Sequence, residues 1–142
     1  MFLDASAIVA ILIGEEDGPE YEQVVLANKG KLYCSPIAIM EATLAIARVR
    51  HKPTKIQPKP NKEAIEDALD AVMIFLDGIE ANEISITSSV GHGAIAALSK
   101  YGRAVGHKAD LNMGDCYSYA CARAYRIPLL YKGNDFKETD LA

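Results

Sequence analysis

The chain has 142 residues, of which 50% are hydrophobic and 24% are charged. This length and composition are typical of one globular domain, and they exclude a disordered tail, a collagen-like fibre and a disulfide-stapled miniprotein. The formal charge of −4 comes from 19 acidic and 15 basic side chains, a sum that taken alone disfavours a nucleic-acid partner.

Short apolar runs, typical of buried strands, alternate along the chain with segments whose apolar residues recur at helical spacing. The expected elements are, in chain order, strand 1–3, helix 6–13, helix 21–28, strand 31–34, helix 36–47, helix 61–76, strand 84–86, helix 88–101, helix 115–125 and strand 128–131. Residues 52–60 contain three prolines and are expected to form a surface loop. Strands that alternate with helices predict an α/β fold with a parallel sheet covered on both faces.

The cysteines and the N-terminus predict a cytoplasmic protein. Three cysteines are an odd number and form no CxxC pair, so neither a disulfide framework nor a zinc site is expected. The apolar N-terminus has no basic segment of the kind that begins a signal peptide. No apolar run reaches the roughly 18 residues that a membrane span needs, so no membrane partner is expected.

Four acidic residues occupy positions where chemistry is expected. Asp4 follows the first strand and Asp135 follows the fourth by a few residues, and ligands of open α/β sheets bind beyond the carboxyl ends of the strands. Glu41 lies among apolar helix neighbours, where an unpaired carboxylate is costly, and Asp115 opens a helix. Mg²⁺ prefers oxygen ligands, and clustered carboxylates repel one another without a cation. Their joint placement therefore predicts a metal site.

Each of these acids also has a purely structural interpretation. Asp4 and Asp115 precede helices, where Asp is a favourable N-cap. Asp135 follows Gly133 and Asn134 and suits a turn. Glu41 can face water. Spacing alone leaves these alternatives open.

The four acids lie in segments that occur in the order and with the spacing of a known family. The segments are Met1-Phe-Leu-Asp4-Ala-Ser6-Ala7, Ser35-Pro-Ile-Ala-Ile-Met-Glu41-Ala, Leu111-Asn-Met-Gly114-Asp115-Cys-Tyr-Ser118-Tyr-Ala120 and Leu129-Leu-Tyr-Lys-Gly-Asn134-Asp135-Phe136. By these segments the chain resembles the PIN-domain ribonucleases, and most closely the VapC-type toxins of bacterial toxin–antitoxin systems. The stretch 52–62 does not align with the family.

The resemblance implies a single PIN domain over residues 1–142, with a PIN-like three-layer α/β/α fold and a short, mostly parallel central sheet of four or five strands. It implies an endoribonuclease that uses Mg²⁺ or Mn²⁺ to cleave structured RNA, such as tRNA or rRNA, leaving a 5′-phosphate and a 3′-hydroxyl. Carried over by motif, the catalytic acids are Asp4, Glu41, Asp115 and Asp135. Asp4 and Asp115 would be the principal metal ligands, Ser6 would support the site by hydrogen bonding, and Asn134 would help orient Asp135.

The resemblance also implies partners. Toxins of this type are held inactive by an antitoxin protein whose tail lies over the acidic site, and they usually form homodimers. The apolar faces of the early helices and of residues 65–76 are candidate interfaces, with core packing as the alternative.

Two functions of other classes remain open. A phospho-acceptor receiver domain also uses acids with Mg²⁺, but it would need adjacent acids near the first strand and a Lys after the last strand, and Leu3-Asp4-Ala5 offers a single acid. A catalytically silent PIN module would serve as a binding scaffold, but it would not need all four acids.

The charge of −4 is unevenly distributed. Residues 63–90 contain seven acids and no Lys or Arg, so the rest of the chain carries +3. Lysines are concentrated at 51–62, which contains four, and further basic residues lie at 100–108. These segments are candidate contacts for an RNA backbone, with solvated loops as the alternative. The sign of the total charge therefore does not exclude RNA.

Overall fold

The computed structural model of the protein describes residues 1–141. Its elements are, in chain order, β1 (Phe2–Leu3), α1 (Ala5–Leu12), α2 (Gly18–Ala27), β2 (Tyr33–Cys34), α3 (Pro36–Arg50), α4 (Lys62–Gly78), β3 (Asn82–Glu83), α5 (Ser88–Tyr101), the short 3-10 helix η1 (Arg103–Val105), α6 (Met113–Tyr125), β4 (Leu129–Leu130) and the 3-10 helix η2 (Asp135–Glu138).

The four strands form one parallel sheet in the order β3-β2-β1-β4. Phe2 of β1 is in register with Tyr33 of β2 on one side and with Leu129 of β4 on the other. Because every strand runs in the same direction, all four carboxyl ends lie at one edge of the sheet. The sequence prediction of a short parallel sheet is confirmed.

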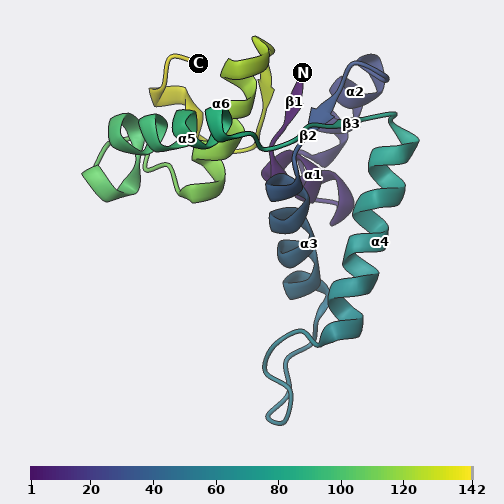
Figure 1. The fold of residues 1–142 in the computed structure, drawn as a ribbon. Helices are drawn as coiled ribbons and strands as arrows, with labels where there is room; N and C mark the ends of the chain where they lie inside the picture. Colours follow the sequence, from purple (N-terminus) through teal and green to yellow (C-terminus); the bar gives the residue numbers. More distant parts are fainter. Residues whose placement is uncertain (142) are drawn as a thin grey trace.

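Helices cover both faces of the sheet. Successive strand residues point to opposite faces, and the two residues of β1 enter two different cores. Phe2 packs with residues of α5 and α6 and with Phe136, whereas Leu3 packs with Ile8 of α1 and Val72 of α4. Figure 1 shows α5 and α6 on one side of the strands and α1, α3 and α4 on the other. The predicted three-layer α/β/α architecture is therefore confirmed.

Several element boundaries differ from the sequence prediction. The β3 strand comprises the exposed Asn82 and Glu83 rather than residues 84–86, because it lies at the sheet edge and pairs through its backbone while its side chains face water. The α2 helix begins three residues early because Pro19 is accommodated in its first turn. The α6 helix begins at Met113 because Asn112, and not Asp115, is its N-cap.

A long pair of helices extends from the sheet. Figure 1 shows α3 and α4 side by side, with the connecting residues 51–61 projecting at their far end. The amphipathic pattern of α4 buries Ala68, Val72 and Leu76, and Ile8 of α1 and Val25 of α2 are also buried. These side chains therefore belong to the core and are not free to form a partner interface, although other apolar side chains of the chain remain exposed.

The structure also bears on the predictions about membrane-spanning segments and cysteines. Among residues 1–141, no helix has both the length and the apolar character that crossing a membrane requires. Cys34, Cys116 and Cys121 are free and buried, as predicted for small apolar thiols.

Candidate active site

The catalytic acids predicted from sequence line a single open cavity of about 420 Å³ beyond the carboxyl ends of β1 and β4. They come from four separate segments of the chain: Asp4 after β1, Glu41 in α3, Asp115 in α6 and Asp135 at the start of η2. This is the sheet edge at which a parallel topology predicts a ligand. The structure thus brings the four acids to one place.

Asp4 is held between the strand and the helix that follows it. Its side chain is 4% exposed, and its Oδ2 accepts hydrogen bonds from the Ser6 backbone N–H at 2.9 Å and from Ser6 Oγ at 2.5 Å. Asp4 is therefore the N-cap of α1 and a cavity residue at once, so the two interpretations are compatible. Within residues 1–141, its Oδ1 accepts no hydrogen bond.

Ser6 connects Asp4 to the last strand. Besides donating to Asp4, Ser6 Oγ accepts a hydrogen bond from the backbone N–H of Lys132 at 2.9 Å, two residues beyond β4. The hydroxyl therefore fixes the orientation of the Asp4 carboxylate relative to the end of β4. This geometry agrees with the supporting role expected for Ser6.

Ser6→Ala is expected to lower the predicted nuclease activity about tenfold, because groups that orient a ligand commonly contribute that much. The backbone N–H of residue 6 still caps through Asp4, so the helix start is retained. Steady-state kinetics of the purified variant provides the measurement. The control is Ser99→Ala on the exposed face of α5, where Oγ donates only to the Ala96 carbonyl. An equal loss in both variants would contradict the role given to Ser6.

Asp115 is fixed by the first turn of α6. The backbone N–H of Asn112 donates to Asp115 Oδ2 at 2.8 Å, and the Asp115 N–H donates to Asn112 Oδ1 at 3.1 Å, which is a capping box. Burial raises the pKa of Asp115 to about 6; the hydrogen bond from Asn112 opposes this shift, and the nearby carboxylates of Asp4 and Asp135 add to it. The single hydrogen bond from Asn112 therefore does not offset the cost of burying the Asp115 charge.

Glu41 is packed directly over the backbone of α6. A Cβ atom at Gly114 would overlap the Glu41 carboxylate, so a residue without a side chain at position 114 is what allows α3 and α6 to approach here. Burial raises the pKa of Glu41 to about 7, with further contributions from the charges of Asp4 and Asp115. The half-buried Glu41 carboxylate therefore belongs to the same electrostatic cluster as the two aspartates.

Glu41→Gln is expected to raise the free energy of unfolding by about 1 kcal/mol at about pH 8 without divalent cations. The folded protein holds the Glu41 proton more tightly than the unfolded chain does, because its pKa is raised from 4.5 to about 7. Stability is therefore lost as the pH rises through this interval and stays low above it. Urea unfolding at about pH 4 and about pH 8 measures the effect. An equal gain at both pH values would contradict this origin.

Asp135 and Asn134 are more exposed than the other predicted residues. Asp135 is the first residue of η2 and lines the cavity, and its charge raises the pKa of Asp115. Asn134 is outside the cavity lining, and within residues 1–141 its side chain forms no hydrogen bond with Asp135. An orienting role for Asn134 stays a prediction.

Sequence reasoning did not identify several residues that complete the cavity. Its lining also includes Glu15, Arg48, Asn112 and Lys132. The Lys132 ammonium pairs with Glu15 and, at 2.8 Å, with Asp17, which raises its pKa. The N-x-x-D spacing of Asn112 and Asp115 was a readable capping signal. The position of Lys132 after β4 matches a receiver domain, but its ammonium contacts Glu15 and Asp17 rather than Asp4.

The donor set of this cavity fits a hard divalent cation. Among the described residues, no Lys or Arg forms a salt bridge with Asp4, Glu41, Asp115 or Asp135, although the charge of Arg103 partly opposes the raised pKa of Asp115. Within residues 1–141, no group of three or more His, Cys, Asp or Glu side chains is placed so that it could hold a metal ion by itself. Mg²⁺ commonly takes only one or two carboxylates and keeps several waters.

Comparisons with known proteins agree with this geometry. The chain matches the PIN domain family over residues 1–141. It is 41% identical to a VapC ribonuclease of Rhizobium meliloti, over 99% of this chain and 98% of that protein, and 36% identical to ribonuclease VapC28 of Mycobacterium tuberculosis, over 98% and 93%. A chain in a solved toxin–antitoxin complex from Klebsiella pneumoniae shares the fold, with a TM-score of 0.62, 18% identity and coverage of 99% of this chain and 92% of that one. The chain therefore belongs to the PIN domain family, among relatives that are named VapC ribonucleases.

Proposed function

We propose that this protein is a divalent-metal-dependent endoribonuclease and the toxin of a type II toxin–antitoxin module. The observation that supports this proposal is the cavity in which Asp4, Glu41, Asp115 and Asp135 meet at the carboxyl edge of the sheet. The names of its relatives, which are VapC ribonucleases, agree with it. Structured RNA, such as tRNA or rRNA, is the proposed substrate class.

The mechanism assigns distinct tasks to the residues of the cavity. A bound Mg²⁺ or Mn²⁺ supplies Lewis acidity and lowers the pKa of a coordinated water. Asp4, oriented by Ser6, and Asp115, oriented by Asn112, would hold the cation. Glu41 and Asp135 would complete the site, either through a second cation or by accepting hydrogen bonds from bound water. The carboxylates act as a unit, so their contributions to the rate are not additive.

The proposed activity is tested with the purified chain and total RNA. Cleavage is expected in Mg²⁺ or Mn²⁺ and is expected to stop in excess EDTA, then return when the metal is restored. Cleavage that continues in EDTA would contradict the metal dependence. A folded protein that binds RNA but leaves it intact with either metal would instead be the catalytically silent scaffold.

Metal binding is expected to be detectable without any reaction. A ligand that binds only the folded state stabilises it, by about 2.7 kcal/mol at a hundredfold excess over Kd. Mg²⁺ or Mn²⁺ should therefore raise the Tm of the wild-type protein, and Asp4→Asn should largely abolish the rise. An equal rise in Asp4→Asn would show that the cation binds elsewhere.

The partners proposed for the protein are a cognate antitoxin and a second copy of the chain. Carboxylates that form no salt bridge among the described residues are suited to an Arg or Lys from an antitoxin segment. The structural neighbour is described as a toxin–antitoxin complex. Light scattering of the chain with and without its co-expressed antitoxin measures both assemblies. The cytoplasmic location expected from the sequence stays a prediction.

A further inference from the structure

A block of positive charge adjoins the candidate active site. Between residues 48 and 62 there are six Lys or Arg side chains and no Asp or Glu, and all six are exposed: Arg48, Arg50, Lys52, Lys55, Lys59 and Lys62. Among the residues that the structure describes, one salt bridge involves this block, between Lys62 and Glu66 at 3.4 Å. The acidic side chains of the following helix, α4, are exposed as well. Charge is thus segregated along the helix pair.

The connecting loop that carries three of these lysines has internal structure. The Gln57 carbonyl accepts a hydrogen bond from the Thr54 backbone N–H at 3.0 Å and lies 3.0 Å from His51 Nε2, and the Gln57 N–H donates to Thr54 Oγ1 at 2.9 Å. Three prolines further restrict the backbone of residues 52–60. We call residues 51–61 the basic arm. Its lysines are presented by an ordered loop, which reduces the entropy cost of binding.

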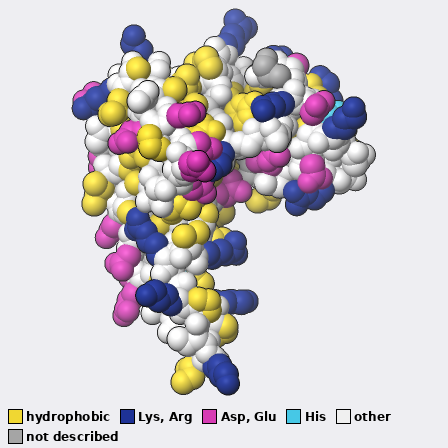
Figure 2. Space-filling model, turned by 180° about the vertical axis from the view of Figure 1, so that it is seen from behind, with side chains coloured by type: hydrophobic (Ala, Val, Ile, Leu, Met, Phe, Trp, Pro, Cys, Tyr) yellow, Lys and Arg dark blue, Asp and Glu magenta, His cyan; other side chains and the backbone are white. Residues whose placement is uncertain are grey.

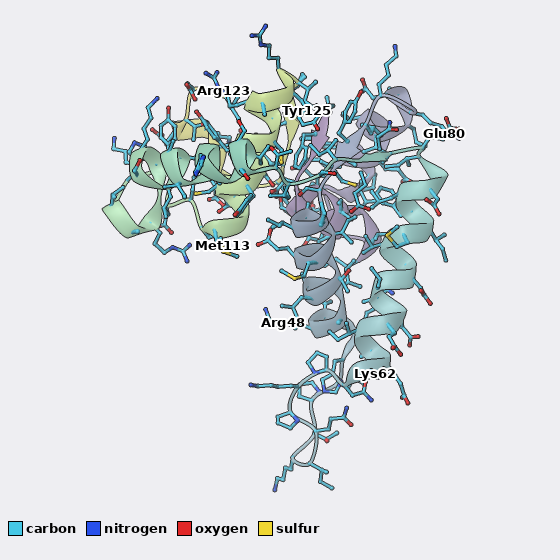
Figure 3. All side chains as sticks on the ribbon, viewed as in Figure 1. Arg48, Lys62, Glu80, Met113, Arg123 and Tyr125 are labelled. Carbon is cyan, nitrogen blue, oxygen red and sulfur yellow. The ribbon has the colours of Figure 1, made fainter. Side chains whose placement is uncertain are left out.

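The basic arm is continuous with the catalytic cavity. Glu41 and Arg48 lie on the same helix, about 10 Å apart along its axis. A second cavity of about 400 Å³, lined by His51, Lys59 and the arm prolines, shares Leu44 and Arg48 with the cavity of the four acids. Figure 3 shows Arg48 projecting from α3 on the side away from α4, the side on which Met113 at the start of α6 also lies.

The distribution of charge suits a polyanion that crosses the acidic cavity. Figure 2 shows acidic side chains gathered where the helix pair joins the body of the molecule, with Lys and Arg side chains along the helix pair below them. Acidic side chains follow one edge of the same helix pair. A phosphate chain would be attracted along the basic side and repelled from the acidic edge.

We propose that the basic arm binds the phosphate backbone of the RNA beside the bond that is cleaved. This inference rests on the proposed nuclease function and adds to it a substrate-binding surface outside the four acids. Lysines on a loop provide point charges for phosphates rather than readout of base edges. The arm therefore contributes affinity and orientation, with little dependence on sequence.

The test removes two charges from the arm and two from a distant control position. Lys55→Gln/Lys59→Gln changes the arm. Lys29→Gln/Lys31→Gln makes the same charge change in the turn before β2, at the amino ends of the strands and so on the side of the sheet away from the cavity. Both pairs are exposed. The control also removes the ion pair between Lys29 and Glu80 at 3.1 Å, but such a pair on the surface contributes little, so both proteins should keep a Tm near that of the wild type. Binding is measured in the Asp4→Asn background by fluorescence anisotropy with a labelled oligouridylate at several salt concentrations.

The arm variant is expected to bind the oligouridylate about tenfold more weakly than the control variant. The slope of log K against log salt should decrease by about 0.7 for each phosphate of the single strand that the variant no longer neutralises. With Asp4 restored, the arm variant should show a raised KM for RNA and an unchanged kcat.

Two outcomes would overturn the inference: arm and control variants that bind the oligouridylate with equal affinity, or an arm variant that loses antitoxin binding but keeps RNA binding. These results differ from failure of the proposed function itself. If the proposed function is wrong, the wild-type chain would not cleave RNA with either metal, and substitutions in the arm would make no difference to cleavage.

Discussion

Asp115→Asn is expected to lower kcat for RNA cleavage by a factor on the order of 10³ while the protein stays folded. An amide at this position keeps the shape of the side chain and can still accept the hydrogen bond from the Asn112 N–H, so the capping box survives. The variant lacks the negative charge that would hold the cation. Because burial raises the pKa of Asp115 to about 6, removing its charge should not lower stability at neutral pH.

The matched control for this variant is Asp110→Asn. Asp110 lies in the loop before α6, is exposed, and pairs with Arg103 at 2.8 Å on the surface. It also has a positive φ of 51°, which Asn tolerates well. Kinetics and the Mg²⁺ dependence of Tm should change for Asp115→Asn and stay near wild type for Asp110→Asn. Full activity of a folded Asp115→Asn protein would exclude Asp115 as a metal ligand.

Gly114→Ala is expected to reduce kcat by a factor of about 10² with a much smaller effect on the fold. The added methyl group would occupy the space of the Glu41 carboxylate, which must then move away from Asp4 and Asp115. A displacement of about 1 Å in a catalytic group can cause a loss of this size. The residue acts only through Glu41, so it is a positioning residue.

The position of Gly91 provides a control of the same chemical change. Gly91 also lies in a helix, and a Cβ there would meet no atom within 4 Å, so Gly91→Ala should retain activity. It should gain about 0.5–1 kcal/mol of stability from the better helix former. In a Glu41→Gln background, Gly114→Ala should cost little further activity because the two changes affect the same packing of α3 on α6. Additive losses would mean that Gly114 acts by another route.

The fold was largely predictable because its signals are local. Apolar runs at 1–3, 31–34 and 128–131 correspond to β1, β2 and β4, and the stripe that includes Val72 and Leu76 gives the buried side of α4. Element ends were less predictable. The edge strand β3 pairs through its backbone and displays Asn82 and Glu83 to water, so hydrophobicity placed it two residues late.

The acids of the candidate site could be predicted from the sequence, but the contacts that hold them in place could not. The position of Asp4 after an apolar run and of Glu41 in an apolar helix can be read directly from the sequence. The hydrogen bond between the Lys132 N–H and Ser6 Oγ joins residues that are 126 positions apart. The packing of Glu41 on Gly114 likewise depends on how α3 and α6 meet. Such contacts follow from tertiary packing, which a local pattern does not encode.

The chemistry of the RNA ends produced in Mg²⁺ tests the central claim most directly. In the proposed mechanism a water from outside the substrate would attack phosphorus and leave linear phosphate ends. The family resemblance implies that the 3′-oxygen is the leaving group, so we expect a 5′-phosphate on one product and a 3′-hydroxyl on the other. A nuclease that instead uses the substrate's own 2′-hydroxyl leaves a 2′,3′-cyclic phosphate and a 5′-hydroxyl. Mass spectrometry of the fragments distinguishes the two. Fragments with 5′-phosphate ends that disappear in EDTA would support cleavage by a metal-activated water, and cyclic phosphate ends would contradict it.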